Sequence, residues 1–197
     1  MPDFVPITPS MSEAVIQHLR DSFFADEPLN KAVGLCQRGQ AHAALERLCA
    51  ATMADRLSIA AVADGRQSID NIRQSSDEKY NKIFTILYTV SRDLKLFETY
   101  KVDRILECRI ISVSEEARGQ GLAKELMRRS IEVAQLNGFK LFKVDATGAF
   151  SQRICVSLGV TEAARVEYDQ YCDADGQPVF NVPAPHTALS VMIRLLD

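Results

Sequence analysis

Apolar residues recur along this chain at two spacings, one typical of amphipathic helices and the other of buried strands. Apolar side chains three or four positions apart predict helices, and short runs rich in β-branched and aromatic residues predict strands. The predicted helices cover residues 11–27, 29–36, 41–53, 121–137 and 152–158, with one long helix or two shorter ones over 77–100. The predicted strands cover residues 4–8, 57–63, 67–73, 105–113, 139–144, 160–168 and 188–196.

Short local signals predict where several of these elements begin and end. Ser10 and Glu13 form a capping box, in which the serine is the N-cap and the glutamate is the third helical residue. Pro28 ends the first helix, because the residue before a proline avoids the helical conformation. Gly138 ends the helix before it, and Asp64-Gly65 favours a hairpin turn.

The order of these elements predicts a mixed α/β fold, with a mixed central sheet flanked by helices, in one domain over residues 1–197. The strand over 139–144 follows the strand over 105–113 through a helix. We therefore expect the two strands to be parallel and joined by a right-handed crossover. A chain of 197 residues, 47% of them hydrophobic, can bury one substantial core.

Composition narrows the classes of partner and cofactor. A net charge of −3 argues against nucleic acid as the main partner. The five cysteines and three histidines are dispersed, so we expect reduced thiols, no disulfide framework and no metal site. The first residues lack a signal pattern and no apolar run reaches the length of a membrane span. We therefore expect a cytoplasmic, monomeric protein with no membrane partner.

The strongest chemical signal is a strand, a polar turn and a helix over residues 105–137. The turn contains Gly119 and Gly121, whose missing side chains leave room for a bulky phosphate beside the backbone. The start of a helix has unpaired N–H groups that favour an anion. Neither of two common phosphate motifs is present, because Lys124 follows Ala123 and stands where a third glycine would belong.

This turn, Arg118-Gly119-Gln120-Gly121-Leu122-Ala123, resembles the Gln/Arg-x-x-Gly-x-Gly/Ala motif of the GCN5-related N-acetyltransferases. The resemblance implies that this protein has their fold and that the pyrophosphate of acetyl-CoA binds to the turn and to Lys124. It also implies that Ile111, Ser112 and Val113 pair with the pantetheine arm of the coenzyme as an added strand would. Backbone amides of the same three residues would receive the oxyanion.

A second motif, Phe23-Phe24-Ala25-Asp26-Glu27-Pro28-Leu29-Asn30, places two acids between an aromatic pair and a proline turn. A carboxylate that faces an apolar pocket has a raised pKa, which suits a general base at neutral pH. The motif resembles the signature of the insect-type arylalkylamine N-acetyltransferases, the dopamine N-acetyltransferase branch. The resemblance implies that Glu27 is the general base, acting through water, and that Phe23 and Asp26 line the amine pocket.

The stretch from Asp145 to Arg153 resembles a loop of the same family that carries two catalytic serines. This chain keeps the second hydroxyl as Ser151 and has Thr147 at the first place. The resemblance implies that both hydroxyls act with Glu27, and that Ser151 also contacts the coenzyme. Alternatively, Thr147 and Ser151 cap the short helix that follows.

The stretch from Phe180 to His186 resembles the segment that leads into the last strand of the family, with one proline displaced. His186 is therefore expected to line the amine pocket or to take part in proton movement. Tyr168 lies in a separate aromatic loop and is expected to close over the amine. A structural hydrogen-bonding role is the alternative for each of them.

Together these motifs predict an acetyl-CoA-dependent N-acetyltransferase that acetylates the primary amine of a small arylalkylamine, such as dopamine, tyramine, octopamine or serotonin. Three alternatives stay open. The acceptor could be a polyamine or a peptide amine, the chain could be a non-catalytic CoA-binding module, or it could be a generic nucleotide-binding domain.

Overall fold

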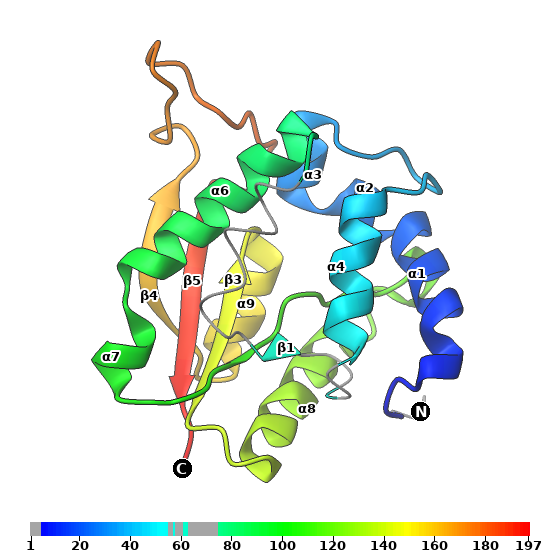
Figure 1. Ribbon diagram of the computed structural model, residues 1–197, viewed down its shortest axis with the longest axis vertical. Coiled ribbons are helices and arrows are strands. Elements are labelled where there is room, and N and C mark those ends of the chain that lie inside the picture. The colour runs from blue at the N-terminus through cyan, green and yellow to red at the C-terminus, as the bar shows by residue number, and fades with distance from the viewer. Residues whose placement is uncertain (1–4, 55–56, 58–60, 63–74) are drawn as a thin grey trace.

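The computed structural model describes residues 5–54, 57, 61–62 and 75–197. Within these residues a five-stranded mixed sheet runs in the order β1-β2-β3-β5-β4 (Figure 1). Strands β2 and β3 are parallel, and the other neighbouring pairs are antiparallel. The strands are β1 (Ala61–Val62), β2 (Leu106–Glu107), β3 (Leu141–Ala146), β4 (Thr161–Glu167) and β5 (Ala188–Leu195).

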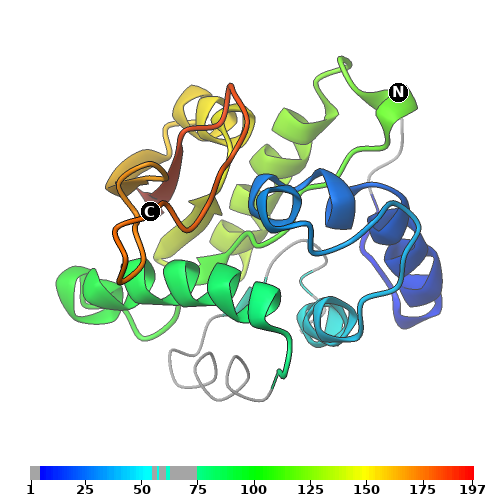
Figure 2. The same ribbon diagram turned by 90° about the horizontal axis from the view of Figure 1, so that it is seen from above.

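Helices cover both faces of the sheet. Helices α8 and α9 pack on one face, and α6 crosses the other face beside the N-terminal helices (Figures 1 and 2). Short 3-10 turns precede α1 and α8. The helices are α1 (Ser12–Asp21), α2 (Phe23–Asp26), α3 (Pro28–Val33), α4 (Ala43–Ala54), α6 (Glu78–Asp93), α7 (Leu96–Tyr100), α8 (Leu122–Leu136) and α9 (Ala149–Ser157).

The two faces bury separate apolar clusters, because successive strand side chains point to opposite faces. Leu106 and Phe142 pack against Met127 of α8 on one face. On the other face, the N-terminal helices and α6 pack over Leu189 of β5, with Phe24 fully buried among them. The mixed α/β fold with helices on both faces of a mixed sheet is therefore confirmed.

The predicted strand over 105–113 is confirmed as the parallel neighbour of β3 but is wrong in length. The Cys108 N–H donates to the Lys143 carbonyl at 2.9 Å, and the pairing between the two strands ends there. Residues 109–113 have no assigned secondary structure. Sequence pattern cannot show this end point, because the apolar run continues while the two backbones part.

The N-terminal predictions also need correction. Residues 5–8 are not in a strand, and Phe4 lies outside the described residues. The capping box does not form: Met11 is the N-cap of α1 and no side chain bonds to the cap. A 3-10 turn with Pro9 at its first position leads directly into the helix and takes the place of a side-chain cap.

Two predicted helices are each divided by one residue. The helix over 11–27 breaks at Ser22, whose hydroxyl donates to the His18 carbonyl at 2.6 Å and competes with the helical backbone. Over residues 77–100, the alternative of two shorter helices is confirmed: α6 and α7 are separate because Lys95 adopts a left-handed conformation with φ of 46°.

Two strands are predicted between α4 and α6, and most of their residues lie outside the described part of the chain. In the predicted strand over 57–63, the described residues are Leu57 and β1, and only β1 is a strand. The rest of that strand, the turn at Asp64-Gly65 and the predicted strand over 67–73 lie outside the described residues.

Three expectations about composition can be compared with the structure. All five cysteines are free thiols, as the sequence predicted. No described helix combines the length and the apolar character that crossing a membrane requires. The described residues contain no cluster of histidine, cysteine and acidic side chains that could hold a metal ion.

The burial pattern predicts a large difference between two leucine substitutions. We expect Leu189→Ala, at a fully buried position, to lower the free energy of unfolding by about 2–5 kcal/mol through the cavity that it leaves. Leu136→Ala removes the same atoms from a side chain that is 86% exposed, and should change it by less than about 0.5 kcal/mol. Urea denaturation followed by circular dichroism measures both. Equal losses would show that Leu136 is covered in solution.

Candidate active site

A cavity of about 1400 Å³ opens between the N-terminal helices, α6 and the sheet. Four parts of the chain that the sequence linked to chemistry line it: the motif around Glu27, residues 111–113, the glycine turn at 117–124, and the start of α9. The fold therefore brings the candidate base and the candidate coenzyme motif to one cavity, although they lie far apart in the sequence.

Glu27 lies between two short helices and is held by both. Its N–H donates to the Phe23 carbonyl at 2.9 Å, and its Oε2 accepts from the Asn30 N–H at 2.7 Å as the N-cap of α3. Pro28 occupies the first turn of α3, where its fixed φ suits a helix start. The buried Asn30 side chain donates from Nδ2 to the Phe24 carbonyl at 3.1 Å. The motif thus positions the carboxylate through short local bonds.

The electrostatics of Glu27 are those of a buried base. Burial raises the pKa of its carboxyl, and the N–H of Asn30, the hydroxyl of Thr147 and the N–H of Leu29 oppose that rise in part. Glu27 as a residue keeps some exposed surface, but its Oε1 atom is buried and has no hydrogen-bond partner among the described residues. One oxygen is therefore anchored and the other is available to accept a proton.

Thr147 is the hydroxyl residue beside Glu27. It lines the cavity directly after β3, and its hydroxyl acts on the Glu27 carboxylate. Tyr168 lies behind it: the tyrosine is 3% exposed, its hydroxyl donates to the Thr147 carbonyl at 2.7 Å, and it is not among the cavity-lining residues. Burial raises the pKa of Tyr168, and the nearby Glu27 charge raises it further. In this structure, Tyr168 supports the Thr147 backbone.

The helix predicted over 152–158 begins earlier, at Ala149, with Gly148 as its N-cap. Neither Thr147 nor Ser151 therefore caps it, because Ser151 already lies in its first turn. The Ser151 hydroxyl donates to the Gly148 carbonyl at 2.8 Å and lines the cavity. Its oxygen lone pairs can still accept a hydrogen bond from a ligand.

His186 lines the same cavity and is tied to the start of α9. Its Nδ1 accepts from the Ala149 N–H at 3.1 Å, which places the proton of the neutral ring on Nε2. Burial lowers the pKa of His186, as do the charges of Lys31 and Arg153. A Cβ on Gly148 would lie 2.9 Å from Nδ1, so only glycine permits this close packing. The structural role is therefore observed, together with a place in the cavity wall.

Residues 109–113 present a free backbone edge to the cavity. Beyond Cys108, the N–H groups of this segment have no acceptor among the described residues. The Ser112 side chain faces away to α1, where its Oγ lies 2.9 Å from His18 Nε2 and 3.0 Å from the Ser22 hydroxyl. An amide-bearing arm can therefore pair with this backbone as a strand would.

The glycine turn has the features of an anion site. Gly119 and Gly121 have φ of 79° and 77°, and a Cβ on either would meet no atom within 4 Å. The first backbone bond of α8 is donated by the Glu125 N–H, so the N–H groups of residues 119–124 have no acceptor in the described structure. These open amides, with Lys124 beside them, fit the diphosphate of a coenzyme.

Asp26 joins the base motif to the glycine turn. Its carboxylate accepts from Arg118 at 2.7 Å and from Arg38 at 2.7 Å. Burial alone would raise the pKa of Asp26, but these two arginines outweigh it and the pKa is lowered. Arg118 also donates to the Val113 carbonyl at 3.3 Å. Asp26 lines the cavity as predicted, with its charge already neutralised.

Most of the predicted site residues meet at this cavity, and two do not. Tyr168, which bonds to the Thr147 carbonyl, and Gln120 are not among the residues that line the cavity. The remaining predicted residues line it: Phe23, Asp26, Glu27, Ile111, Ser112, Val113, Arg118, Gly119, Gly121, Leu122, Ala123, Lys124, Thr147, Ser151 and His186.

The structure adds two sets of lining residues that were not predicted. Aromatic side chains from α6 form one wall, among them Tyr80 and Phe84, whose rings stack at 4.2 Å. Charged side chains from β2 and β3 form another part. The sequence contains a signal that could have identified the second set. Charged residues lie two positions apart in each of the two predicted parallel strands, so they point to the same face: Glu107 and Arg109 in one, Lys143 and Asp145 in the other.

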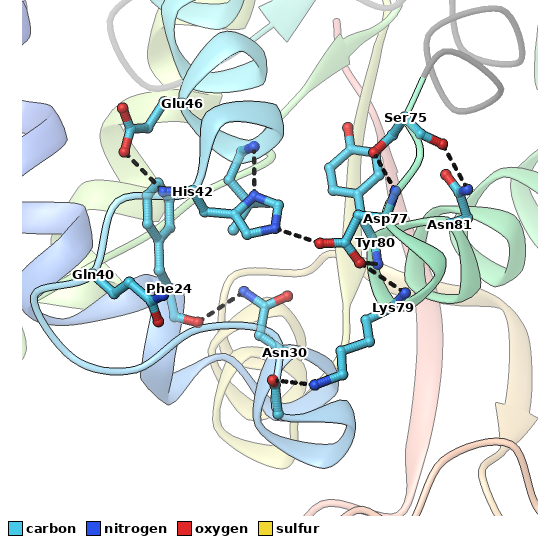
Figure 3. A network of polar contacts seen from close by, with 12 residues as sticks. Phe24, Asn30, Gln40, His42, Glu46, Ser75, Asp77, Lys79, Tyr80 and Asn81 are labelled. Atoms are coloured by element: carbon cyan, nitrogen blue, oxygen red, sulfur yellow. Dashed lines mark hydrogen bonds and ion pairs between the residues drawn. The ribbon is translucent and has the colours of Figure 1, made fainter.

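A polar network ties the helices of the cavity wall together (Figure 3). The imidazole of His42 accepts from the Leu45 N–H at the start of α4, and its Nε2 lies 3.0 Å from Asp77. Asp77 is the N-cap of α6 and accepts from the N–H groups of Lys79 and Tyr80. One histidine–aspartate pair therefore fixes the two helix starts relative to each other.

Comparisons with known proteins identify the family of this chain. The model of the acetyltransferase (GNAT) family matches residues 94–158, which contain the glycine turn. The arylalkylamine N-acetyltransferase 2 of Aedes aegypti is 38% identical, with 99% of each chain covered and a TM-score of 0.93.

Two further solved structures share the fold. A putative arylalkylamine N-acetyltransferase 7 from the yellow fever mosquito is 26% identical over 98% of this chain and 86% of its own, with a TM-score of 0.83. The Drosophila melanogaster polyamine N-acetyltransferase, which catalyses the formation of N-acetylagmatine, is 20% identical. The match covers 97% of this chain and 98% of the other, with a TM-score of 0.81. At that identity the last likeness concerns the fold alone.

The full-length match at 38% identity carries the conclusion beyond the fold, and the GNAT family model agrees with it. This chain therefore belongs to the insect-type arylalkylamine N-acetyltransferases of the GNAT family and is an acyltransferase that acts on amines.

Proposed function

We propose that this enzyme transfers the acetyl group of acetyl-CoA to the primary amine of an arylalkylamine such as dopamine, tyramine, octopamine or serotonin, with Glu27 as the general base. The observation that carries the proposal is the state of Glu27. It is an anchored carboxylate with a raised pKa and a buried, unpartnered Oε1, in the same cavity as an anion-binding turn.

The free backbone edge at residues 109–113 would hold the pantetheine arm of the coenzyme, and the amides of 119–124, with Lys124, would hold its diphosphate. When bound, the coenzyme supplies an acetyl thioester. Ser151 contacts it from the start of α9, where the hydroxyl oxygen faces the cavity. The open amides on both segments support this assignment.

Glu27 prepares the acceptor for attack. A primary alkylammonium has a pKa of about 10 and cannot act as a nucleophile until it loses a proton. Glu27 Oε1 takes that proton through a water molecule, while the Asn30 N–H holds Oε2 and keeps the carboxylate aimed. The Thr147 hydroxyl, which lowers the pKa of the same carboxylate by hydrogen bonding, connects the base to the end of β3.

The free amine then attacks the carbonyl carbon directly. A C–N bond forms and the C–S bond breaks. The ammonium proton is already on Glu27, and the second proton, which the nitrogen loses after attack, passes to the leaving thiolate, so that the products are the amide and a free thiol. The unpartnered N–H groups at Ile111 to Val113 stabilise the negative charge that develops on the carbonyl oxygen. The chain's own contribution is therefore orientation, proton removal and oxyanion stabilisation.

The charges in the cavity favour an acceptor with a single amine. Asp26 is neutralised by two arginines, and Lys143 lies within hydrogen-bond distance of both Glu107 and Asp145. Among the buried or half-buried carboxylates that line the described cavity, only Glu27 lacks a cationic partner. A polyamine would need a second unpaired acid for its distal ammonium. The aromatic wall of α6 suits an aryl group instead.

Substitution of the base tests its role. We expect Glu27→Gln to lower kcat by about 10²–10⁴-fold, the usual contribution of general base catalysis, with the Kd for acetyl-CoA unchanged by calorimetry. Glu98→Gln is the matched control, because Glu98 also lines the cavity but is exposed on α7.

Stability provides a second readout for the same variant. The pKa of Glu27 is raised in the folded state, so its stabilising contribution is present at low pH and is lost as the pH rises through the folded pKa. Glu27→Gln should therefore leave the Tm unchanged or higher at pH 8. A kcat near the wild-type value in this folded variant would remove the assigned role.

The pH dependence of kcat/KM distinguishes Glu27 from a second buried acid. We expect an ascending limb with an apparent pKa above that of a free glutamate, because burial raises the pKa of the base. Burial and the Glu107 charge, opposed by Lys143, raise the pKa of Asp145 as well. The limb should persist in Asp145→Asn and disappear from the residual activity of Glu27→Gln. The reverse pattern would identify Asp145 as the base.

An acceptor panel at fixed acetyl-CoA tests the substrate class. We expect kcat/KM for tyramine, dopamine and serotonin to exceed the values for agmatine and spermidine by at least about tenfold, because the cavity has one unpaired buried acid. Preference for agmatine or spermidine would favour the polyamine alternative. Coenzyme binding without acetylation of any amine would favour a non-catalytic module.

A further inference from the structure

The cavity contains a group of buried charges that the proposed reaction does not use. This four-charge cluster consists of Glu107, Arg109, Lys143 and Asp145. The Lys143 ammonium lies 2.5 Å from Glu107 Oε1 and 2.7 Å from Asp145 Oδ2, and the Arg109 Nε donates to Glu107 Oε2 at 2.9 Å. Glu107 and Lys143 are 7% and 5% exposed. All four line the cavity.

Arg109 is the member with unused hydrogen-bonding capacity. Its Nε is occupied by Glu107, but its two terminal nitrogens have no acceptor among the residues that the structure describes. The side chain is 27% exposed, and this surface faces the cavity. Its charge also acts on Tyr80 of the aromatic wall: burial raises the pKa of that tyrosine, and Arg47 and Arg109 oppose the rise. The free fork therefore lies close to the aromatic wall.

The cluster and the base are connected along β3 and the residues that follow it. Lys143, Asp145 and Thr147 alternate along β3 and its end, so successive members of this series are about 7 Å apart. Thr147 is beside Glu27, and Glu107 is paired in register with Lys143. With the amine nitrogen at Glu27, the aryl ring is directed along the cavity toward the cluster, because α6 residues, Glu27 and the four charges line the same cavity.

The charge balance of the cluster indicates what it recognises. Two cations and two carboxylates leave the cluster without net charge. An added ammonium would be repelled by Arg109 and Lys143, and an added carboxylate would be repelled by Glu107 and Asp145. A neutral hydroxyl oxygen is repelled by neither pair. It can accept from the free Arg109 nitrogens and donate to Asp145, which Ser91 approaches at only 3.3 Å and 3.4 Å.

We propose that Arg109 is a specificity-determining residue that donates hydrogen bonds to a ring hydroxyl of the acceptor, so that the enzyme selects hydroxylated arylalkylamines over unsubstituted ones. This inference rests on the proposed function. It adds a second polar anchor at the far end of the substrate, opposite the amine.

Tyramine and phenethylamine provide the test, because they differ by one ring hydroxyl. We expect the wild-type enzyme to prefer tyramine in kcat/KM. In Arg109→Met, kcat/KM for tyramine should fall about 10-fold to 100-fold, as for a lost hydrogen bond to a charged group. The value for phenethylamine should stay within about twofold. Arg165→Met, which removes an arginine and its carboxylate pairs on β4 outside the cavity, should change neither value.

A second variant guards against a purely structural effect. Arg109→Lys keeps a cation beside Glu107 but loses the planar fork. It should retain the wild-type Tm and still lower the tyramine to phenethylamine ratio. Equal losses for both amines in both variants, or a preference for tyrosine or agmatine over tyramine, would overturn the inference.

The same measurements separate this inference from the proposed function. A wild-type enzyme that acetylates tyramine and phenethylamine equally well contradicts the role of Arg109 and leaves the reaction intact. A wild-type enzyme that acetylates no arylalkylamine contradicts the proposed function itself. Glu27→Gln should lower the activity toward both amines by the same factor, so that the ratio of their residual activities is unchanged.

Discussion

The structure of this site depends on a carboxylate that is buried without a cation to neutralise it. An ionised acid in such a place is normally protonated, paired or moved into solvent. Here the Glu27 side chain is held in the cavity because its Oε2 caps α3 through the Asn30 N–H. Its Oε1 has no hydrogen-bond partner among the described residues. Glu27 is at once the C-cap of α2 and the N-cap of α3, and Pro28 is the first residue of α3, so both short helices hold the base in place.

No cationic side chain among the described residues that line the cavity forms an ion pair with Glu27. Each other buried or half-buried acid on the described lining has a cationic partner: Asp26 pairs with Arg38 and Arg118, and Glu107 and Asp145 share Lys143. These pairs leave Glu27 as the place where an incoming ammonium finds an unsatisfied acid. They also fix structure, because the Asp26 and Arg118 pair links the base motif to the glycine turn.

The parting of β2 from β3 is the second requirement. A parallel pair that stayed together beyond Cys108 would use the backbone amides that a coenzyme needs. Once the strands part, residues 109–113 face the cavity on one side and β3 continues to pair with β5 on the other. The N-terminal helices and α6, joined by the His42 and Asp77 pair, then close the space between them.

The sequence by itself determined the parts of this protein whose chemistry is local. The glycine turn, the Glu27 motif and the helices with clear apolar spacing were all predictable, since a tight turn, a helix start and an amphipathic face each depend on neighbouring residues. The family resemblance rested on these same stretches. The capping box at Ser10 shows the limit of local signals, because Pro9 produced a competing local turn.

Only the tertiary structure decided which of these parts meet and which of their charges remain free. Whether Asp26 binds an amine or an arginine depends on Arg118, 92 positions away in the sequence. Whether Tyr168 faces the substrate or supports Thr147 depends on how the end of β4 packs against the end of β3. The unpaired fork of Arg109 is likewise invisible in sequence, because hydrogen bonds and burial between distant segments arise only when the strands and helices pack together.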